Sequence, residues 1–304
     1  MNIIYRINNT CRFPGAMPVI CALLLTIISC ATAPSATAIP PFRQGVLTAN
    51  QQTAAAFADI NSFLRRQQIE HAMKQTALTE DLFFEALGSE DLVKWDHAFG
   101  FIDSYAAKLE RLLDPNQRAG VEEEISALGQ KIEAVNKDQL PTGFSAAFTK
   151  LGGFLVQMKA EHNAFAAIRK ADPAIQNVFN AMMEAIGVDP GSGIRGTVNA
   201  SWRQILAHID VTEFRRAGSE GAKRAAVTHY VETLDQRDAQ DRLLNSLRLS
   251  LATLAKAHQE LAQGREVSAA ALIAIIQDEY KAFLDELDAI RRHNEAISTS
   301  GGTT

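Results

Sequence analysis

Histidine side chains are the first candidates for metal chemistry in this 304-residue chain. A carboxylate-bridged di-iron site in a helical bundle uses Glu-x-x-His pairs on facing helices, and a zinc protease uses His-Glu-x-x-His. No histidine has a glutamate three residues before it, and His-Glu-x-x-His does not occur. The sequence therefore predicts no metal site of either kind. The seven histidines are His71, His97, His162, His208, His229, His258 and His293.

Two other local patterns could point to catalysis or phosphate binding. Asp96-His97 and Glu161-His162 place an acid beside a histidine, but neighbours on a helix point about 100° apart and do not face each other. The stretch 191–196, Gly-Ser-Gly-Ile-Arg-Gly, has neither a preceding strand nor the Lys-Ser/Thr of a phosphate-binding loop. No Gly-x-Ser-x-Gly nucleophile motif occurs. We therefore expect a turn or hinge at these glycines and no enzymatic activity.

His258 differs from the other histidines because it lies in a row of apolar residues spaced by three and four, between Leu254 and Leu261. Such a row, or seam, is the stripe of a helix that packs against another helix. A polar residue at a seam position can fix the register or pairing of helices at some cost in stability. Because an unperturbed histidine has a pKa of about 6.5, such a residue could also make assembly sensitive to pH. We expect a packing or register role for His258. The alternatives are a pH-sensitive assembly and an exposed seam without consequence.

The N-terminal segment has the features of an export signal. All three cysteines, Cys11, Cys21 and Cys30, lie within it. A stretch with arginine but no acidic residue precedes residues 17–28, which carry no charge. This run is too short to cross a ~30 Å hydrocarbon core as a helix, but it has the length of the apolar region of a signal peptide. If processing removes residues 1–29, only Cys30 remains and no intramolecular disulfide can form.

Residues 27–30, Ile-Ile-Ser-Cys, resemble the lipobox of bacterial lipoprotein precursors, in which apolar residues and a small residue precede the cysteine that is lipidated. The resemblance covers residues 1–30 only. It implies cleavage between Ser29 and Cys30 and a covalent lipid on Cys30, with no other cofactor. Several acyl chains hold a protein stably at a membrane, whereas a single chain does not. Ala31, in place of the aspartate that retains such proteins at the inner membrane, implies the outer membrane, facing the periplasm.

A second processing site is present after Ala36-Thr37-Ala38, which has the small-x-small pattern of signal-peptide cleavage. Cleavage there would release a soluble periplasmic or secreted protein. An uncleaved anchor is the third alternative. We expect lipidation at Cys30.

The remainder of the chain divides by composition. Residues 30–47 are rich in Ala, Pro, Ser and Thr, whereas apolar residues recur afterwards at spacings of three and four, which is the helix signal. The expected order is a signal peptide at 1–29, the lipidated Cys30 and a tether at 30–47, an N-terminal helical part at 48–187, a Gly-rich loop at 188–196, a C-terminal long-helix part at 197–297 and a disordered tail at 298–304.

The apolar spacing predicts an all-α fold, an elongated antiparallel helical bundle with coiled-coil-like seams. Apolar residues in 92–113 alternate spacings of three and four over three repeats, and residues 244–261 show a similar seam. Strand-like alternation and Asn-Gly or Asp-Gly hairpin turns are absent. The expected helices cover about 48–75, a short segment after 79, 89–113, 115–135, 144–186 with a break or kink at Asp172-Pro173, 197–217, 219–263 and 267–297.

The net charge and the lengths of the apolar stretches limit the partners that the chain could have. The net charge is −5, from 30 basic and 35 acidic residues without a basic block, which argues against a nucleic-acid partner. The apolar stretches 144–158 and 267–275 are too short to span a membrane as helices and are either core or membrane-active.

We therefore expect a lipid-anchored periplasmic scaffold, spacer or protein-interaction module without catalytic activity. Its partners would be the membrane, through the lipid, and another protein or a second copy, with no small-molecule substrate. The alternatives are a membrane-active helical protein of the pore-forming-toxin type and a helical-bundle ligand binder or enzyme.

Overall fold

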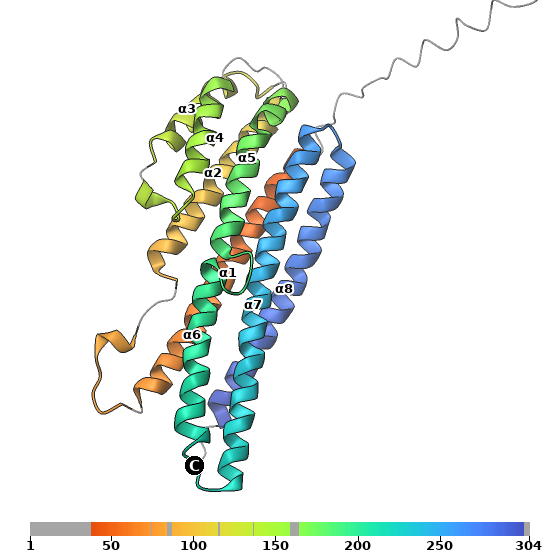
Figure 1. Cartoon of the computed structure of the whole chain (residues 1–304). Coiled ribbons are helices and arrows are strands. Elements are labelled where there is room, and N and C mark those ends of the chain that lie inside the picture. The colour runs from red at the N-terminus through yellow and green to blue at the C-terminus, as the bar shows by residue number, and fades with distance from the viewer. Residues whose placement is uncertain are drawn as a thin grey trace, which may run out of the picture. The chain divides into compact units, whose positions relative to one another are not determined.

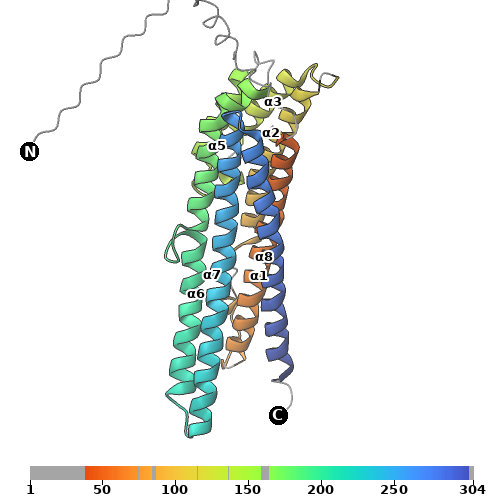
Figure 2. The same cartoon turned by 90° about the vertical axis from the view of Figure 1, so that its right-hand side faces the viewer.

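The structure is a computed structural model that describes residues 38–73, 75–83, 87–114, 116–135, 137–158 and 164–300. Within these residues the chain forms eight α-helices and no β-strand, so the predicted all-α fold with antiparallel helix packing is confirmed. The helices belong to one compact unit, Ala36–Thr304, and run side by side along its length (Figure 1, Figure 2). The predicted signal peptide and the Ser29–Cys30 site lie outside the described residues.

The helices follow one another with short connections. A 3-10 turn at Glu80–Leu82 lies between the first two helices, another at Lys137–Gln139 lies between the third and fourth, and a π-helical turn at Asp210–Phe214 follows the sixth. The helices are α1 (Ile39–Ala72), α2 (Ser89–Leu113), α3 (Val121–Glu133), α4 (Ser145–Gln157), α5 (Ala164–Ile186), α6 (Gly193–Ile209), α7 (Glu220–Ala262) and α8 (Glu266–Ser300).

Helix α7 is the longest helix that the structure describes, and four other helices pack against it. It has 43 residues, which at 1.5 Å per residue corresponds to about 65 Å. The Oγ of Ser219 accepts a hydrogen bond from the backbone N–H of Ala222 (3.2 Å) and caps its first turn. Helix α7 contacts α1, α5, α6 and α8. The predicted seam is buried among these helices, at Leu244, Leu247, Leu251, Leu254, His258 and Leu261.

Helix α1 begins earlier than the sequence predicts. It starts at Ile39 rather than about residue 48, with prolines in its first turn. Proline is tolerated there because the first backbone N–H groups of a helix have no intrahelical acceptor. Phe42 and Val46, which the composition assigned to a tether, are fully buried in the core. The second half of the predicted tether at 30–47 is therefore part of the bundle.

Two helix boundaries near proline and glycine also differ from the prediction. The predicted break at Asp172-Pro173 does not occur, because α5 continues through Pro173. The Gly-rich loop is shorter than 188–196, since α6 already begins at Gly193. At the C-terminus α8 extends to Ser300, into the predicted tail at 298–304. The two predicted helical parts share one hydrophobic core, which includes residues from α1 to α8.

The apolar stretch 144–158 belongs to this core. Phe148 and Leu151 on α4 are fully buried. Helices α3 and α4 approach each other closely at two glycines, because a Cβ placed on Gly129 would lie 2.7 Å from the carbonyl oxygen of Gly152. The stretch 267–275 is one-sided, with Ala269 and Ile273 buried but Val267, at its start, exposed. In the described part of the chain, no helix combines the length and hydropathy needed to cross a membrane.

Candidate functional site

The imidazole of His258 joins four helices in the interior of the bundle. The ring is 0% exposed. Its Nε2 lies 3.1 Å from the hydroxyl oxygen of Tyr105 on α2, and its Nδ1 lies 2.8 Å from Oδ1 of Asp172 on α5. The ring of Phe42 on α1 packs against it with a centroid distance of 5.5 Å. The alternative in which His258 lies on an exposed seam is therefore wrong, because other helices of the same chain cover the seam.

Asp172 is held by a second donor on its own helix. Nε2 of Gln176 donates to Oδ1 of Asp172 (3.0 Å) and to the carbonyl of Ala255 on α7 (2.7 Å). Burial alone would raise the pKa of Asp172, but the hydrogen bonds from His258 and Gln176 and the charge of His258 outweigh it and lower the pKa overall. The carboxylate of Asp172 is therefore ionised at neutral pH.

The protonation of Tyr105 and the tautomer of His258 follow from these partners. Burial, together with the negative charge of Asp172, raises the pKa of the Tyr105 hydroxyl. An ionised Asp172 only accepts hydrogen bonds, so Nδ1 of His258 carries a hydrogen and donates it to Asp172. In the tautomer whose only ring hydrogen is on Nδ1, Nε2 accepts the hydrogen bond that the Tyr105 hydroxyl donates. The three groups form a directional chain from Tyr105 through His258 to Asp172.

This chain has the polarity of a nucleophile, base and orienting acid, but its setting is structural. A hydroxyl that donates to an imidazole held by a carboxylate is the arrangement that activates a nucleophile. The reacting hydroxyl must also be reachable by substrate. Tyr105 and His258 are both enclosed by neighbouring helices. The arrangement therefore orients three side chains and fixes the crossing of α2, α5 and α7.

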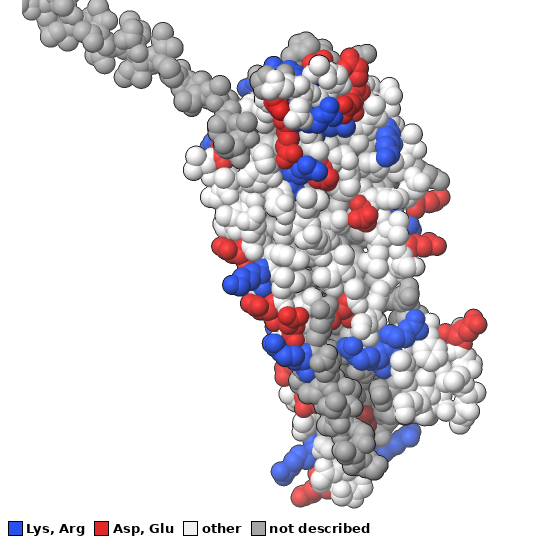
Figure 3. All heavy atoms as spheres, turned by 180° about the vertical axis from the view of Figure 1, so that it is seen from behind, with Lys and Arg blue, Asp and Glu red and all other residues white. Residues whose placement is uncertain are grey.

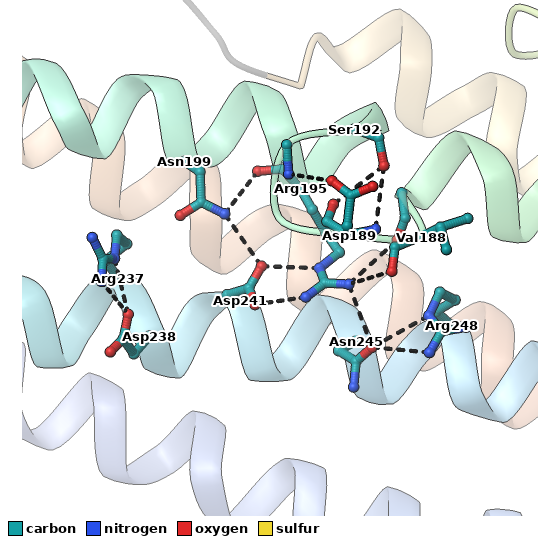
Figure 4. Close-up of polar contacts among 12 residues, drawn as sticks. Val188, Asp189, Ser192, Arg195, Asn199, Arg237, Asp238, Asp241, Asn245 and Arg248 are labelled. Atoms are coloured by element: carbon teal, nitrogen blue, oxygen red, sulfur yellow. Dashed lines mark hydrogen bonds and ion pairs between the residues drawn. The ribbon is translucent and has the colours of Figure 1, made fainter.

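A second buried polar cluster, the Arg195 clasp, lies nearer the N-terminus of α7 than His258 does (Figure 4). Arg195 on α6 makes a two-pronged ion pair with Asp241 on α7, with Nε–Oδ1 and Nη2–Oδ2 distances of 2.9 and 2.7 Å. The side chains of the two residues are 7% and 21% exposed. Asn199 donates a further hydrogen bond to Asp241 (3.2 Å). The clasp therefore joins α6 to α7 through a charge pair that is largely removed from solvent.

The clasp also fixes the loop that connects α5 and α6. Nη1 of Arg195 donates to the carbonyl oxygens of Val188 (3.2 Å) and Gly187 (3.4 Å). Gly187 has φ 112°, and a Cβ there would lie 2.1 Å from the carbonyl oxygen of Ser192. The loop can turn this tightly only with glycine at that position. The predicted turn is thus present, and the arginine within it is its anchor.

Sequence reasoning treated Arg195 as part of a loop and missed its partner. A signal was present, because Arg195 is the only charged residue between Asp189 and Arg203. It also precedes Val198 and Trp202 by three and seven residues, which places it on the buried face of α6. Asp172 had no comparable signal, since its position before proline resembles a turn.

The other sequence candidates remain apart from these clusters. Asp96 accepts a hydrogen bond from Asn50 (2.9 Å), and the adjacent His97 is exposed. The second acid–histidine pair of the sequence, Glu161-His162, lies outside the described residues, and so does Cys30. Among the residues that the structure describes, no group of three or more His, Cys, Asp or Glu side chains is placed to hold a metal ion.

Comparisons with known proteins give no family for the chain. A scan against protein-family models finds no match, and neither the curated proteins nor the solved structures contain a significant match.

Proposed function

We propose that the chain is an exported lipoprotein whose helical unit acts as a non-catalytic scaffold or docking module, held by lipid on Cys30 at the periplasmic face of the outer membrane. The observation that carries the proposal is that two buried polar clusters hold α7 against its neighbouring helices. The His258 network and the Arg195 clasp use their hydrogen-bonding groups within the chain. Buried polar groups that satisfy one another stabilise one arrangement of helices and leave few groups for a substrate.

The length of chain between Cys30 and α1 limits how far the helical unit could lie from the proposed anchor. Only eight residues separate Cys30 from Ile39, where α1 begins. A fully extended chain reaches about 30 Å over this distance. A lipid on Cys30 would therefore keep the first turn of α1 near the membrane surface.

The position of Ile39 also bears on the alternative cleavage after Ala38. That cleavage would leave the ammonium group of Ile39 at the start of α1. A positive charge is unfavourable at a helix N-terminus, where the helix dipole is positive. Ile39 and Ala38 are both 1% exposed, so the new charged terminus would begin at a buried position. A new terminus at Ile39 is therefore unfavourable, which supports processing at Cys30.

Docking to another protein would have to use a face other than the α7 seam. Leu244, Leu247 and Leu251 are buried against helices of the same chain. On the face shown in Figure 3, acidic and basic side chains are interspersed between broad uncharged areas. A surface of this kind is suited to contacts that combine apolar and polar groups.

Insertion of 144–158 into a membrane has less support than docking. The large side chains of this stretch, including Phe144, Phe148 and Leu155, are buried in the core. They could reach lipid only if α4 separated from α3 and α5, against which it packs. Exposing these side chains to make a hairpin would remove the burial that stabilises the fold.

The anchor is tested by replacing one cysteine at a time in cells supplied with an alkyne analogue of palmitate. The natural chain and Cys21→Ser should both incorporate the label, whereas Cys30→Ser should not. Cys21→Ser is the matched control because it removes a thiol from the signal segment without touching the proposed acceptor. Mass spectrometry of the natural chain should give an N-terminal peptide that begins at an acylated Cys30. An unmodified peptide that begins at Ile39 would show that the chain is secreted instead.

A further inference from the structure

A cavity of about 480 Å³ opens between α6, the π-helical turn and α7. Its floor is apolar and includes Leu206, Ile209 and Ala226, all of which are buried. Phe214 and Val227 line its mouth and are partly exposed to solvent. The volume falls in the range of pockets that hold small ligands, about 300–1,000 Å³. The lining residues belong to α6, the π-helical turn and α7 alone.

The π-helical turn shapes this cavity. The backbone N–H of Arg215 bonds to the carbonyl of Asp210 (3.0 Å), five residues earlier, so the chain makes a wider turn than an α-helix. Such insertions are rare and recur at functional sites. The wider turn carries Asp210 and Phe214, both of which line the cavity. The irregular backbone and the cavity therefore coincide.

The rim of the cavity carries an excess of positive charge. Among the lining residues, Asp210 pairs with Arg215 (2.6 Å) and Arg237 pairs with Asp238 (2.7 Å), so those charges are offset. Arg203, which also lines the cavity, has no hydrogen bond or ion pair with any residue that the structure describes. Its guanidinium group is exposed at the rim with all its donors available.

We propose that this cavity binds an anionic amphiphile, a molecule with an acyl chain and one carboxylate or phosphate group. The acyl chain would cover Leu206, Ile209 and Ala226, and the anionic group would bind the guanidinium of Arg203. Apolar walls favour an apolar chain because they offer no partner to a buried polar group. A guanidinium group binds carboxylate or phosphate through charge-assisted hydrogen bonds and repels a cationic head. The site lies wholly in the helical unit and does not depend on a lipid at Cys30.

Photoaffinity labelling of the full chain in phosphatidylcholine vesicles tests the site. The probe is dodecanoate with a diazirine in its acyl chain, and mass spectrometry locates the adducts. Labelling should concentrate in residues 203–234. Excess dodecanoate should suppress it, whereas dodecyltrimethylammonium, with the same chain and the opposite charge, should not. Adducts spread evenly over the helices, or concentrated at the cavity between α2 and α3 lined by Phe101 and Leu128, would overturn the proposal.

Two variants and a control test whether binding needs the charge of Arg203 and the volume of the cavity. Arg203→Glu should lower the apparent affinity of the probe at least about tenfold, because a charge-assisted hydrogen bond is replaced by repulsion. Ala207→Trp introduces an indole from an exposed position on α6 that lines the cavity, and it should abolish labelling. Arg216→Glu makes the same change of charge at an exposed residue that is not part of the lining, so labelling should stay within about twofold. Equal labelling of Arg203→Glu and Arg216→Glu would contradict the proposed role of Arg203.

The source of the amphiphile is resolved with a second probe. Phosphatidylglycerol carrying the same diazirine in one acyl chain replaces dodecanoate in the vesicles. If it labels residues 203–234 and Arg203→Glu prevents this, the site accepts a membrane lipid. If only dodecanoate labels these residues, the site takes a free fatty acid. Absence of Arg203-dependent labelling with both probes would rule out the site.

Discussion

The two ends of α7 are built differently. Toward its C-terminus Leu244, Leu254 and His258 are fully buried among other helices, whereas Val227 and Val231 near its N-terminus are each 48% exposed. The N-terminal end pairs with α6 and the π-helical turn and reaches beyond the end of α1 (Figure 2). The C-terminal end of α7 is therefore enclosed, whereas its N-terminal end is open to solvent. We expect stability to depend mainly on the enclosed end, and the open end carries the proposed ligand site.

The polar groups follow the same division. Arg195 and His258 have partners on other helices and little exposure to solvent, so each is difficult to replace. Arg237, nearer the open end, pairs with its exposed neighbour Asp238. An exposed pair contributes little to folding, whereas removal of one member of a buried pair leaves the other charge without compensation.

Removal of Arg195 should have the largest effect. Arg195→Leu removes the cation that pairs with Asp241, which keeps only the hydrogen bond from Asn199, and it removes the donor to two loop carbonyls. We expect a loss of about 3–5 kcal/mol in the free energy of unfolding, measured in urea at neutral pH. Arg237→Leu removes an arginine from an exposed pair and should cost about 0–1 kcal/mol. Asp241→Leu combined with Arg195→Leu should be less damaging than Arg195→Leu alone. Equal effects of Arg195→Leu and Arg237→Leu would contradict the division of α7 into two ends.

Removal of His258 should have the next largest effect. His258→Leu keeps a similar apolar volume in the seam but leaves Asp172 and the Tyr105 hydroxyl each without one partner. Unsatisfied buried groups cost about 1–3 kcal/mol each, so we expect about 2–4 kcal/mol in the same urea experiment. His229→Leu is the matched control, since His229 bonds to Glu213 (2.9 Å) with its side chain 44% exposed. A loss no larger than that of His229→Leu would show that the network does not stabilise the bundle.

Acid should remove the smaller, charge-dependent part of the His258 network. The pKa of Asp172 is lower in the folded chain than its unfolded value of about 3.9. The ionised carboxylate therefore stabilises the folded state above the unfolded pKa, and this contribution is lost as pH falls through the folded pKa. Asp172→Asn cannot ionise, so the stability gap between the natural chain and this variant should narrow as pH falls from about 4, near the unfolded pKa, through the lower folded pKa. A gap that stays constant over this interval would contradict the assignment.

The apolar pattern was sufficient to predict the helices and much of the core. Leu247 and Leu251 are buried as their seam spacing predicts, and so are Trp95 and Ile102 on α2. Such spacing is reliable because a helix repeats its buried face every three or four residues whatever it packs against. The early start of α1 was missed, because Ala, Pro, Ser and Thr are also the composition of linkers.

The partners of the buried polar groups could not be predicted in the same way. His258 and Asp172 are 86 residues apart, and Tyr105 is 153 residues from His258. Local spacing reports which face of a helix is apolar, but it does not report which helix lies opposite. The cavity beside Arg203 depends on a π-helical turn, and its sequence shows no proline or glycine to mark it.

The position of α1 has a kinetic consequence. Gln52 on α1 bonds to Ser246 on α7, 194 residues away, and α1 also packs against α8. A chain that crosses a membrane from its N-terminus delivers α1 first and these partners last. If this chain is exported as proposed, the side of α1 that faces α7 and α8 would stay uncovered during most of translocation, and its burial would wait for the C-terminal helices. Contacts between such distant segments slow folding, so an exported chain of this topology would complete its core late and be open to capture or aggregation until then.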